Sequence, residues 1–272
     1  MSPFGMAIVV PTLEIFANEF QSSYSIIQFI ISAYLFGLAI SQPFMGFLSD
    51  KLGRKPVMIS GIILFIIASY ICMTAETLST LIAARFLQGV GGSVGTVTSR
   101  AIIRDSYSGD QAAKSLSRVT ATMGMAPMIA PVIGAIALSI LGSPNGIFLI
   151  TLLIGVLILF PVLFFLPETV IKHDPEKTQT AWYKNYYKLL RSETFVGSTF
   201  IYGFTTGSFF AILAVGSTVF SKDLGIDSTG FGLVWSSLTI LYASASFFAG
   251  NLTDRIGLMQ VLNIGAILNL VA

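Results

Sequence analysis

Long apolar runs follow one another along almost the whole chain, and they limit its fold more than any other feature. A helix that crosses a membrane needs about 20 mostly apolar residues. Eight runs of this kind occur, at 2–20, 24–48, 56–75, 78–104, 112–140, 145–167, 194–219 and 228–252, and a ninth begins near Gly257. They do not alternate with a period of two, as strands do. The sequence therefore predicts an all-α membrane protein with about eight complete transmembrane helices and a partial ninth.

The composition agrees with this prediction and excludes several classes of function. The 272 residues are 54% hydrophobic and 10% charged, whereas an ordinary soluble domain has about 25% charged residues. One His and one Cys leave little for a metal site or a nucleophile–base pair. We therefore expect no cofactor, no metal and no nucleic-acid partner. An integral-membrane enzyme is a poor alternative, because no catalytic set of side chains falls at a shared depth.

Basic residues indicate the orientation, since they concentrate in cytoplasmic connections. If the first run points outward, the outer connections hold only Lys222. The inner connections and helix ends then hold Lys51, Arg54, Lys55, Arg100, Arg104, Lys114, Arg118, Lys172, Lys177, Lys184, Lys188, Arg191 and Arg255. The sequence thus places the N-terminal side of the first span in the cytoplasm.

One extended polar stretch divides the chain. We predict an N-terminal six-helix bundle at 1–167, a cytoplasmic linker at 168–193 and a partial C-terminal bundle at 194–272. Within the linker, AWYKNYYKLLR (181–191) would place aromatic and basic residues on separate faces of a helix. Such a helix suits the inner membrane surface. The alternative is a flexible tether.

A short motif occurs twice, as GFLSDKLGRK (46–55) and GNLTDRIGLM (250–259), after the second run of each half. A repeat at equivalent places indicates a transporter of two similar bundles with a substrate site between them. Glycines permit close approach of helix ends, and Asp50 can pair with a base, for which Arg100 and Arg104 are the nearest candidates. We predict a cytoplasmic latch that opens and closes; the alternative is that these charges only fix topology. The proposed latch residues are Gly46, Asp50, Lys51, Gly53, Arg54, Lys55, Arg100, Arg104, Asp254 and Arg255.

Arg85 lies about seven residues inside the run 78–104. An arginine at such depth costs at least ~2.5 kcal/mol, so it is by default a functional candidate. Glu14 lies at nearly the same depth if the first run is one regular helix. We therefore place Arg85, Gln88 and Glu14 on a substrate or proton pathway, and expect Glu14 to approach Arg85. The alternatives are that Arg85 snorkels to the outer surface and that Glu14 is an ordinary outer-end carboxylate.

Three motifs together resemble a known family. GFLSDKLGRK is similar to the signature of the major facilitator superfamily between spans 2 and 3, and RFLQGVGGSVG, with Arg85, Gln88 and Gly89, resembles its second motif. APMIAPVIGA, with Pro127, Pro131 and Gly134, resembles its antiporter motif. The chain looks most like the bicyclomycin and chloramphenicol resistance (Bcr/CflA) branch. That resemblance implies twelve spans and a monomer in the bacterial inner membrane, which would use the proton gradient to export small hydrophobic or amphipathic compounds.

Two departures from the branch qualify this expectation. Ala7 stands four positions before Pro11, where the branch usually has an acidic residue, so its commonest proton site is missing. The run that begins near Gly257 stops at Ala272, so spans 10 to 12 are absent and we expect residues 1–272 alone not to transport. The alternatives are a truncated, non-transporting fragment and a facilitator-type transporter of another small solute.

Overall fold

The computed structural model describes residues 1–170, residues 187–222 and scattered positions between 234 and 267. The chain forms two compact units, Met1–Ile171 and Lys172–Ala272. In the second unit the described helix is α10, Glu193–Lys222. Most of the aromatic and basic stretch at 181–191 and nearly all of the second motif copy, including Asp254 and Arg255, lie outside the described residues.

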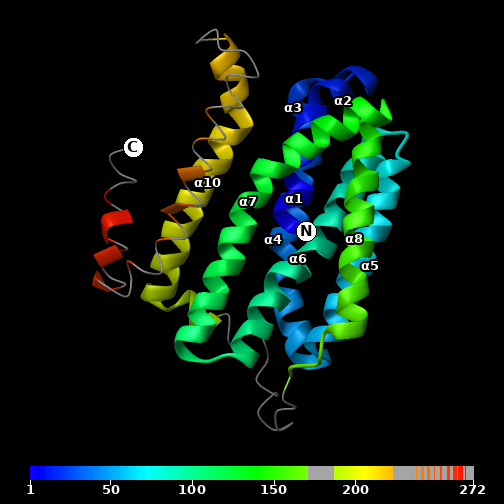
Figure 1. Ribbon diagram of the computed structural model, residues 1–272. Coiled ribbons are helices and arrows are strands. Elements are labelled where there is room, and N and C mark those ends of the chain that lie inside the picture. Colours follow the sequence, from blue (N-terminus) through cyan, green and yellow to red (C-terminus); the bar gives the residue numbers. More distant parts are fainter. Residues whose placement is uncertain are drawn as a thin grey trace. The chain divides into compact units, whose positions relative to one another are not determined.

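The first unit is built from helices of very different lengths (Figure 1). Its elements are α1 (Ser2–Ala7), η1 (Val10–Thr12), α2 (Leu13–Glu19), α3 (Tyr24–Ile27), α4 (Phe29–Leu52), α5 (Arg54–Met73), α6 (Leu78–Ser106), α7 (Gly109–Leu141), η2 (Pro144–Gly146) and α8 (Ile147–Phe165). Among the described residues, the segments long and apolar enough to cross a membrane are Tyr24–Leu52, Arg54–Met73, Lys114–Leu141 and Pro144–Phe165. The predicted all-α fold class is confirmed.

The first apolar run is broken, which corrects the expected single span over 2–20. Helix α1 ends at Ala7, and the chain passes through the 3₁₀ turn η1 before α2 begins at Leu13. Pro11 explains the break, because proline has no backbone N–H and its ring clashes with the preceding turn. At the turn, Thr12 donates from its backbone N (2.9 Å) and its Oγ1 (2.8 Å) to the carbonyl of Val9.

Helix α6 is the centre of the unit, since it packs along both α4 and α5, while α8 packs on α5 and α1 packs on α7. Glycines make the close contacts of α6 possible. A Cβ at Gly91 would lie 2.6 Å from the Phe65 nitrogen and 2.7 Å from the Gly61 oxygen, and a Cβ at Gly89 would overlap the Tyr34 carbonyl. Small residues allow this approach of helix backbones.

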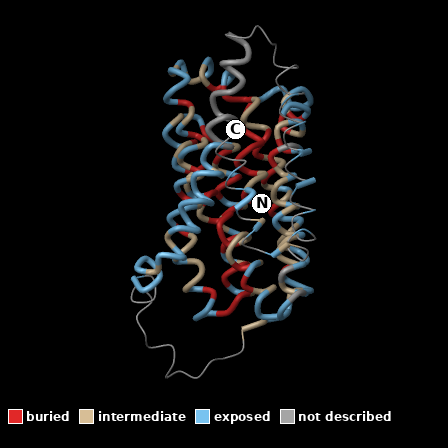
Figure 2. The backbone as a smooth tube through the Cα atoms, turned by 90° about the vertical axis from the view of Figure 1, so that its left-hand side faces the viewer, coloured by how far each residue is buried: buried red, intermediate tan, exposed pale blue. Residues whose placement is uncertain are grey.

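Buried positions follow the inward sides of these helices, and apolar side chains also cover outward sides (Figure 2). Phe36 on α4 is 61% exposed, and Leu157 and Phe164 on α8 are 72% and 68% exposed. Large apolar side chains at such positions suit hydrocarbon rather than water. The unit thus exposes large apolar side chains and also buries polar ones, among them Arg85 and Gln88.

Candidate functional site

Arg85 on α6 is fully buried inside the first unit and is hydrogen-bonded to three elements. Its Nε donates to the carbonyl of Ile30 on α4 (3.1 Å). Its Nη1 donates to the carbonyl of Gly5 on α1 (2.9 Å) and to Oε1 of Gln88, one turn further along α6 (2.6 Å). The alternative that Arg85 snorkels to the surface is therefore wrong.

Aromatic rings and backbone dipoles surround the Arg85 charge. Its guanidinium carbon lies 4.3 Å from the ring centroid of Tyr34 and 5.8 Å from that of Phe148. Within the described part of the chain, Arg85 forms no ion pair and its Nη2 has no hydrogen-bond partner. Arginine stays protonated in proteins. The interior of the unit therefore carries a positive charge that carbonyl oxygens and ring faces stabilise.

Gln88 extends this contact into a network across the bundle. Its Nε2 donates to Ser69 Oγ on α5 (2.7 Å) and to Thr151 Oγ1 on α8 (3.1 Å). The structure thus brings the predicted pair Arg85 and Gln88 together and adds Tyr34, Ser69 and Thr151, which sequence reasoning missed. A buried amide needs partners for its N–H groups, but the sequence does not show which hydroxyl from another helix lies at its depth.

Glu14 does not join this network. It is exposed on α2, and the described residues contain no ion pair between it and Arg85. The predicted approach of Glu14 to Arg85 is wrong in this structure. The expectation assumed one regular helix, in which depth follows from a rise of 1.5 Å per residue, and the break at Pro11 removes that relation.

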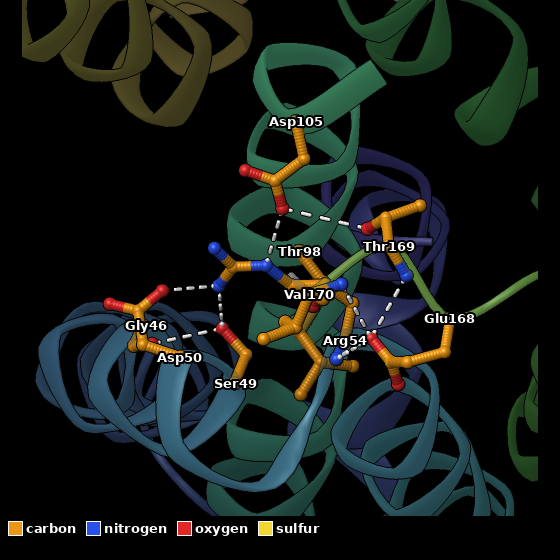
Figure 3. Close-up of polar contacts among 10 residues, drawn as sticks. Gly46, Ser49, Asp50, Arg54, Thr98, Asp105, Glu168, Thr169 and Val170 are labelled. Atoms are coloured by element: carbon orange, nitrogen blue, oxygen red, sulfur yellow. Dashed lines mark hydrogen bonds and ion pairs between the residues drawn. The ribbon is translucent and has the colours of Figure 1, made fainter. Parts of the chain in front are cut away.

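A second polar cluster lies around Arg54, where the C-terminal ends of α4 and α6 meet the start of α5 (Figure 3). Arg54 Nη1 donates to Asp50 Oδ1 (2.5 Å) and to Ser49 Oγ (2.7 Å), and its Nε donates to Asp105 Oδ2 (2.9 Å). Arg54 is 8% exposed. Its guanidinium therefore joins the end of α4 to the end of α6.

These contacts correct the predicted partners of Asp50. The carboxylate of Asp50 pairs with Arg54, which lies across the Gly53 break at the start of α5, and not with Arg100 or Arg104, whose side chains are exposed. The sequence-based prediction considered only basic partners on α6 and did not include Asp105, the acid beside Arg104. That acid reaches Arg54 because α5 and α6 pack side by side.

Glu168, just beyond α8, completes this cluster and was also missed. Its Oε1 accepts from the backbone nitrogens of Arg54 (2.9 Å), Thr169 (3.0 Å) and Val170 (3.0 Å), and its Oε2 accepts from that of Lys55 (3.2 Å). Burial alone would raise the pKa of Glu168, but these four backbone donors outweigh it and hold the pKa below its ordinary value. The side chain is thus an anion at neutral pH.

The glycines of the repeated motif have matching backbone conformations. Gly53, between α4 and α5, has φ +106°, and Gly257, at the equivalent place in the second copy, has φ +84°. Side chains rarely adopt such angles. A Cβ at Gly53 would also lie 2.5 Å from Glu168 Oε2. Gly46 contributes its carbonyl, which accepts from Ser49 Oγ (2.9 Å), while the Lys51 side chain is exposed.

The predicted antiporter-like residues lie on α7, which continues from Gly109 to Leu141 through Pro127 and Pro131. A Cβ at Gly134 would overlap the carbonyl of Ile8. Gly134 therefore lets α7 approach the break between α1 and η1. That Pro127, Pro131 and Gly134 act as an antiporter motif stays a prediction.

Comparisons with known proteins agree with this architecture. A family model described as Major Facilitator Superfamily matches residues 1–272. The chain is 31% identical over 275 residues to the "Uncharacterized MFS-type transporter YdgK" of Bacillus subtilis, which covers 100% of this chain and 68% of that protein. It is 28% identical over 266 residues to the "Bicyclomycin resistance protein homolog" of Haemophilus influenzae, which covers 97% of this chain and 66% of that protein.

The fold also matches a solved structure, that of the human organic anion transporter MFSD10 (TETRAN). The TM-score is 0.68 at 16% identity, over 94% of this chain and 70% of that one. The chain thus spans about two thirds of the length of the relatives reported above. Its repeated motif, its apolar helices and the match over all 272 residues lead to one conclusion: the chain belongs to the major facilitator superfamily and is an integral membrane protein.

Proposed function

We propose that this protein takes part in proton-coupled export of small hydrophobic or amphipathic compounds by alternating access. The Haemophilus influenzae relative is named as a homologue of the bicyclomycin resistance protein, which supports an export function. The observation that carries the proposal is the buried network of Arg85 and Gln88. It places a permanent charge and several polar groups inside an apolar bundle, where polar residues are costly and mark substrate or ion pathways.

Arg85 cannot carry the proton itself, because a guanidinium does not lose its charge in proteins. In a site of low dielectric it attracts anions and the negative ends of dipoles over several ångströms. It also fixes the carbonyl of Gly5 beside the break in the first run. We therefore assign Arg85 and Gln88 to the substrate pathway and keep Glu14, an exposed carboxylate on α2, as the acid of the proton pathway.

Efflux measured in everted membrane vesicles tests this function. Everted vesicles containing the full-length protein should accumulate a neutral or amphipathic drug in their lumen when a proton gradient is imposed, because their cytoplasmic face is outside, and collapse of the gradient should stop this uptake. Gradient-independent movement of the drug would favour the second candidate, a facilitator of another small solute. The relatives do not favour the alternative of a truncated, non-transporting fragment over an export function.

We further propose that the protein is a monomer of the bacterial inner membrane with the N-terminal side of the first span in the cytoplasm. The basic side chains at the inner end support this orientation. An impermeant thiol reagent applied from either side to Lys51→Cys and to Glu76→Cys tests it. The first should react from the cytoplasm and the second from outside; the reverse would contradict the orientation.

A further inference from the structure

Helix α5 begins at a place where the chain has no local cap for its first backbone N–H groups. Gly53, at the cap position, has no side chain to accept a hydrogen bond, and its φ of +106° requires glycine there. Pro56, in the first turn, has no N–H to satisfy. The N–H groups of Arg54 and Lys55 remain, and buried or half-buried donors of this kind need an acceptor.

Glu168 supplies that acceptor from 114 residues further along the chain. One of its carboxylate oxygens accepts from the Arg54 nitrogen (Figure 3), and the other accepts from the Lys55 nitrogen. A negative charge at a helix N-terminus is also favoured by the helix dipole. Glu168 is therefore the remote N-cap of α5.

The same carboxylate also binds the backbone of the two residues that follow it, Thr169 and Val170. It accepts from the nitrogens of Thr169 and Val170, and the Thr169 hydroxyl reaches Asp105 Oδ2 at 3.5 Å. Asp105 in turn pairs with the Arg54 guanidinium. Glu168 thus binds the backbone nitrogen of Arg54. The adjacent Thr169 contacts Asp105, which pairs with the Arg54 side chain.

The first unit ends at Ile171, so the residues that Glu168 fixes are the last ones before the connection to the second unit. We propose that Glu168 is a positioning residue that fastens the start of this connection to the α4–α5 loop and keeps Arg54 seated between Asp50 and Asp105. Displacement of the connection acts first on Glu168 and through it on Arg54. The capping role does not depend on transport; its use in alternating access rests on the proposed function.

A buried reporter cysteine at the inner end tests the proposal in the full-length protein. Thr98, two turns before Asp105 on α6, is fully buried, and the native Cys72 is replaced by alanine so that Thr98→Cys is the reactive group within this unit. In everted vesicles without substrate or gradient, Glu168→Gln should raise the rate of maleimide labelling of Thr98→Cys about three-fold or more. Glu76→Gln, an exposed glutamate elsewhere in the unit, is the matched control and should leave the rate unchanged.

Equal labelling rates in the parent and in Glu168→Gln would overturn the proposal, and so would an equal rise in Glu76→Gln. If Glu168→Gln does not insert, Glu168→Asp gives the result, because its shorter side chain keeps the charge but does not reach both nitrogens. It should raise the rate by a smaller factor, and an unchanged rate would also overturn the proposal. Because no transport is measured, failure of the cap and failure of the export function are distinguishable.

Discussion

The guanidinium of Arg85 lies over the ring of Tyr34, 4.3 Å from its centroid, and the hydroxyl of the same Tyr34 donates to the carbonyl of Ser2 at 2.9 Å. Arg85 itself holds the carbonyl of Gly5. One cation and one phenol, on α6 and α4, therefore fix the short helix α1 at two of its carbonyl groups. This arrangement explains why a charge is retained at a depth where membrane insertion disfavours it.

Replacement of Arg85 by lysine should destabilise the protein nearly as much as replacement by glutamine. An ammonium group lacks the planar fork that reaches Gly5, Ile30 and Gln88 together. Each unsatisfied buried group costs about 1–3 kcal/mol, so the midpoint of thermal unfolding in detergent should fall by several degrees. Arg100→Lys, at an exposed position, is the control and should leave it unchanged. Wild-type stability of Arg85→Lys would show that charge alone suffices.

Replacement of Glu14 by glutamine should abolish the dependence of drug transport on the proton gradient, since glutamine lacks the carboxylate to which the proposal assigns proton transfer. Glu19→Gln is the matched control, because Glu19 is also exposed and lies on the same helix α2. The measurement is the initial rate of drug uptake into everted vesicles from pH 6 to 8. If both variants keep the parent's rate and pH profile, Glu14 is not the proton carrier.

The two acids that pair with Arg54 should contribute unequally to stability. The side chain of Asp105 is 26% exposed and that of Asp50 is 65% exposed, and solvent weakens the more exposed pair. Asp105→Asn should therefore cost about 1.5–3 kcal/mol, and Asp50→Asn about 1 kcal/mol or less. Chemical unfolding of the purified variants measures both. A larger loss in Asp50→Asn would contradict this ranking.

The contribution of Glu168 should depend on pH in one direction. Its pKa in the folded protein is below the ordinary glutamate value of 4.5, so the folded state favours the ionised form. The stabilisation is complete above pH 4.5 and is lost as the pH falls through the lower folded value. The difference in unfolding temperature between the parent and Glu168→Gln should therefore be constant from pH 7 to 5.5 and shrink below pH 4.5. A difference that grows on acidification would contradict the assignment.

Alanine at Gly91 should destabilise the bundle by about 1–3 kcal/mol, the usual cost of overpacking. Its Cβ would lie 2.6 Å from the backbone nitrogen of Phe65, so α5 and α6 would have to separate. Gly197→Ala on α10 is the control, because a Cβ there meets no atom within 4 Å, and alanine in a helix should stabilise by up to about 1 kcal/mol. Thermal unfolding compares the two. Equal effects would show that α5 and α6 tolerate a wider spacing.

The sequence predicts the parts of this protein that depend on local pattern. Run length and the absence of charge locate α4, α5, α6, α7 and α8 because the bilayer sets one length for every crossing helix. The depth of Arg85 and its closeness to Gln88 also follow from helical spacing, since residues three apart share a face.

Contacts between distant segments are not predictable in this way. Glu168 lies 114 residues from Arg54 and Thr151 lies 63 residues from Gln88, so each contact depends on how whole helices pack. The error over Glu14 has a different cause: the 3₁₀ turn at Pro11 interrupts the first run, so a depth counted at 1.5 Å per residue no longer holds beyond it. Asp105 was missed because the rule that sets membrane topology depends on Lys and Arg and contains almost no information on acidic residues.

The left-handed glycines at 53 and 257 have a consequence for how the gene tolerates mutation. Each follows the second long run of its half in the sequence and has a positive φ, so any L-residue at either place would strain the backbone. A saturation library of the whole chain should therefore show two codons, far apart in the gene, at which few substitutions are tolerated. Because the motif occurs twice in the sequence, the chain has two positions at which replacement of a glycine would strain the backbone.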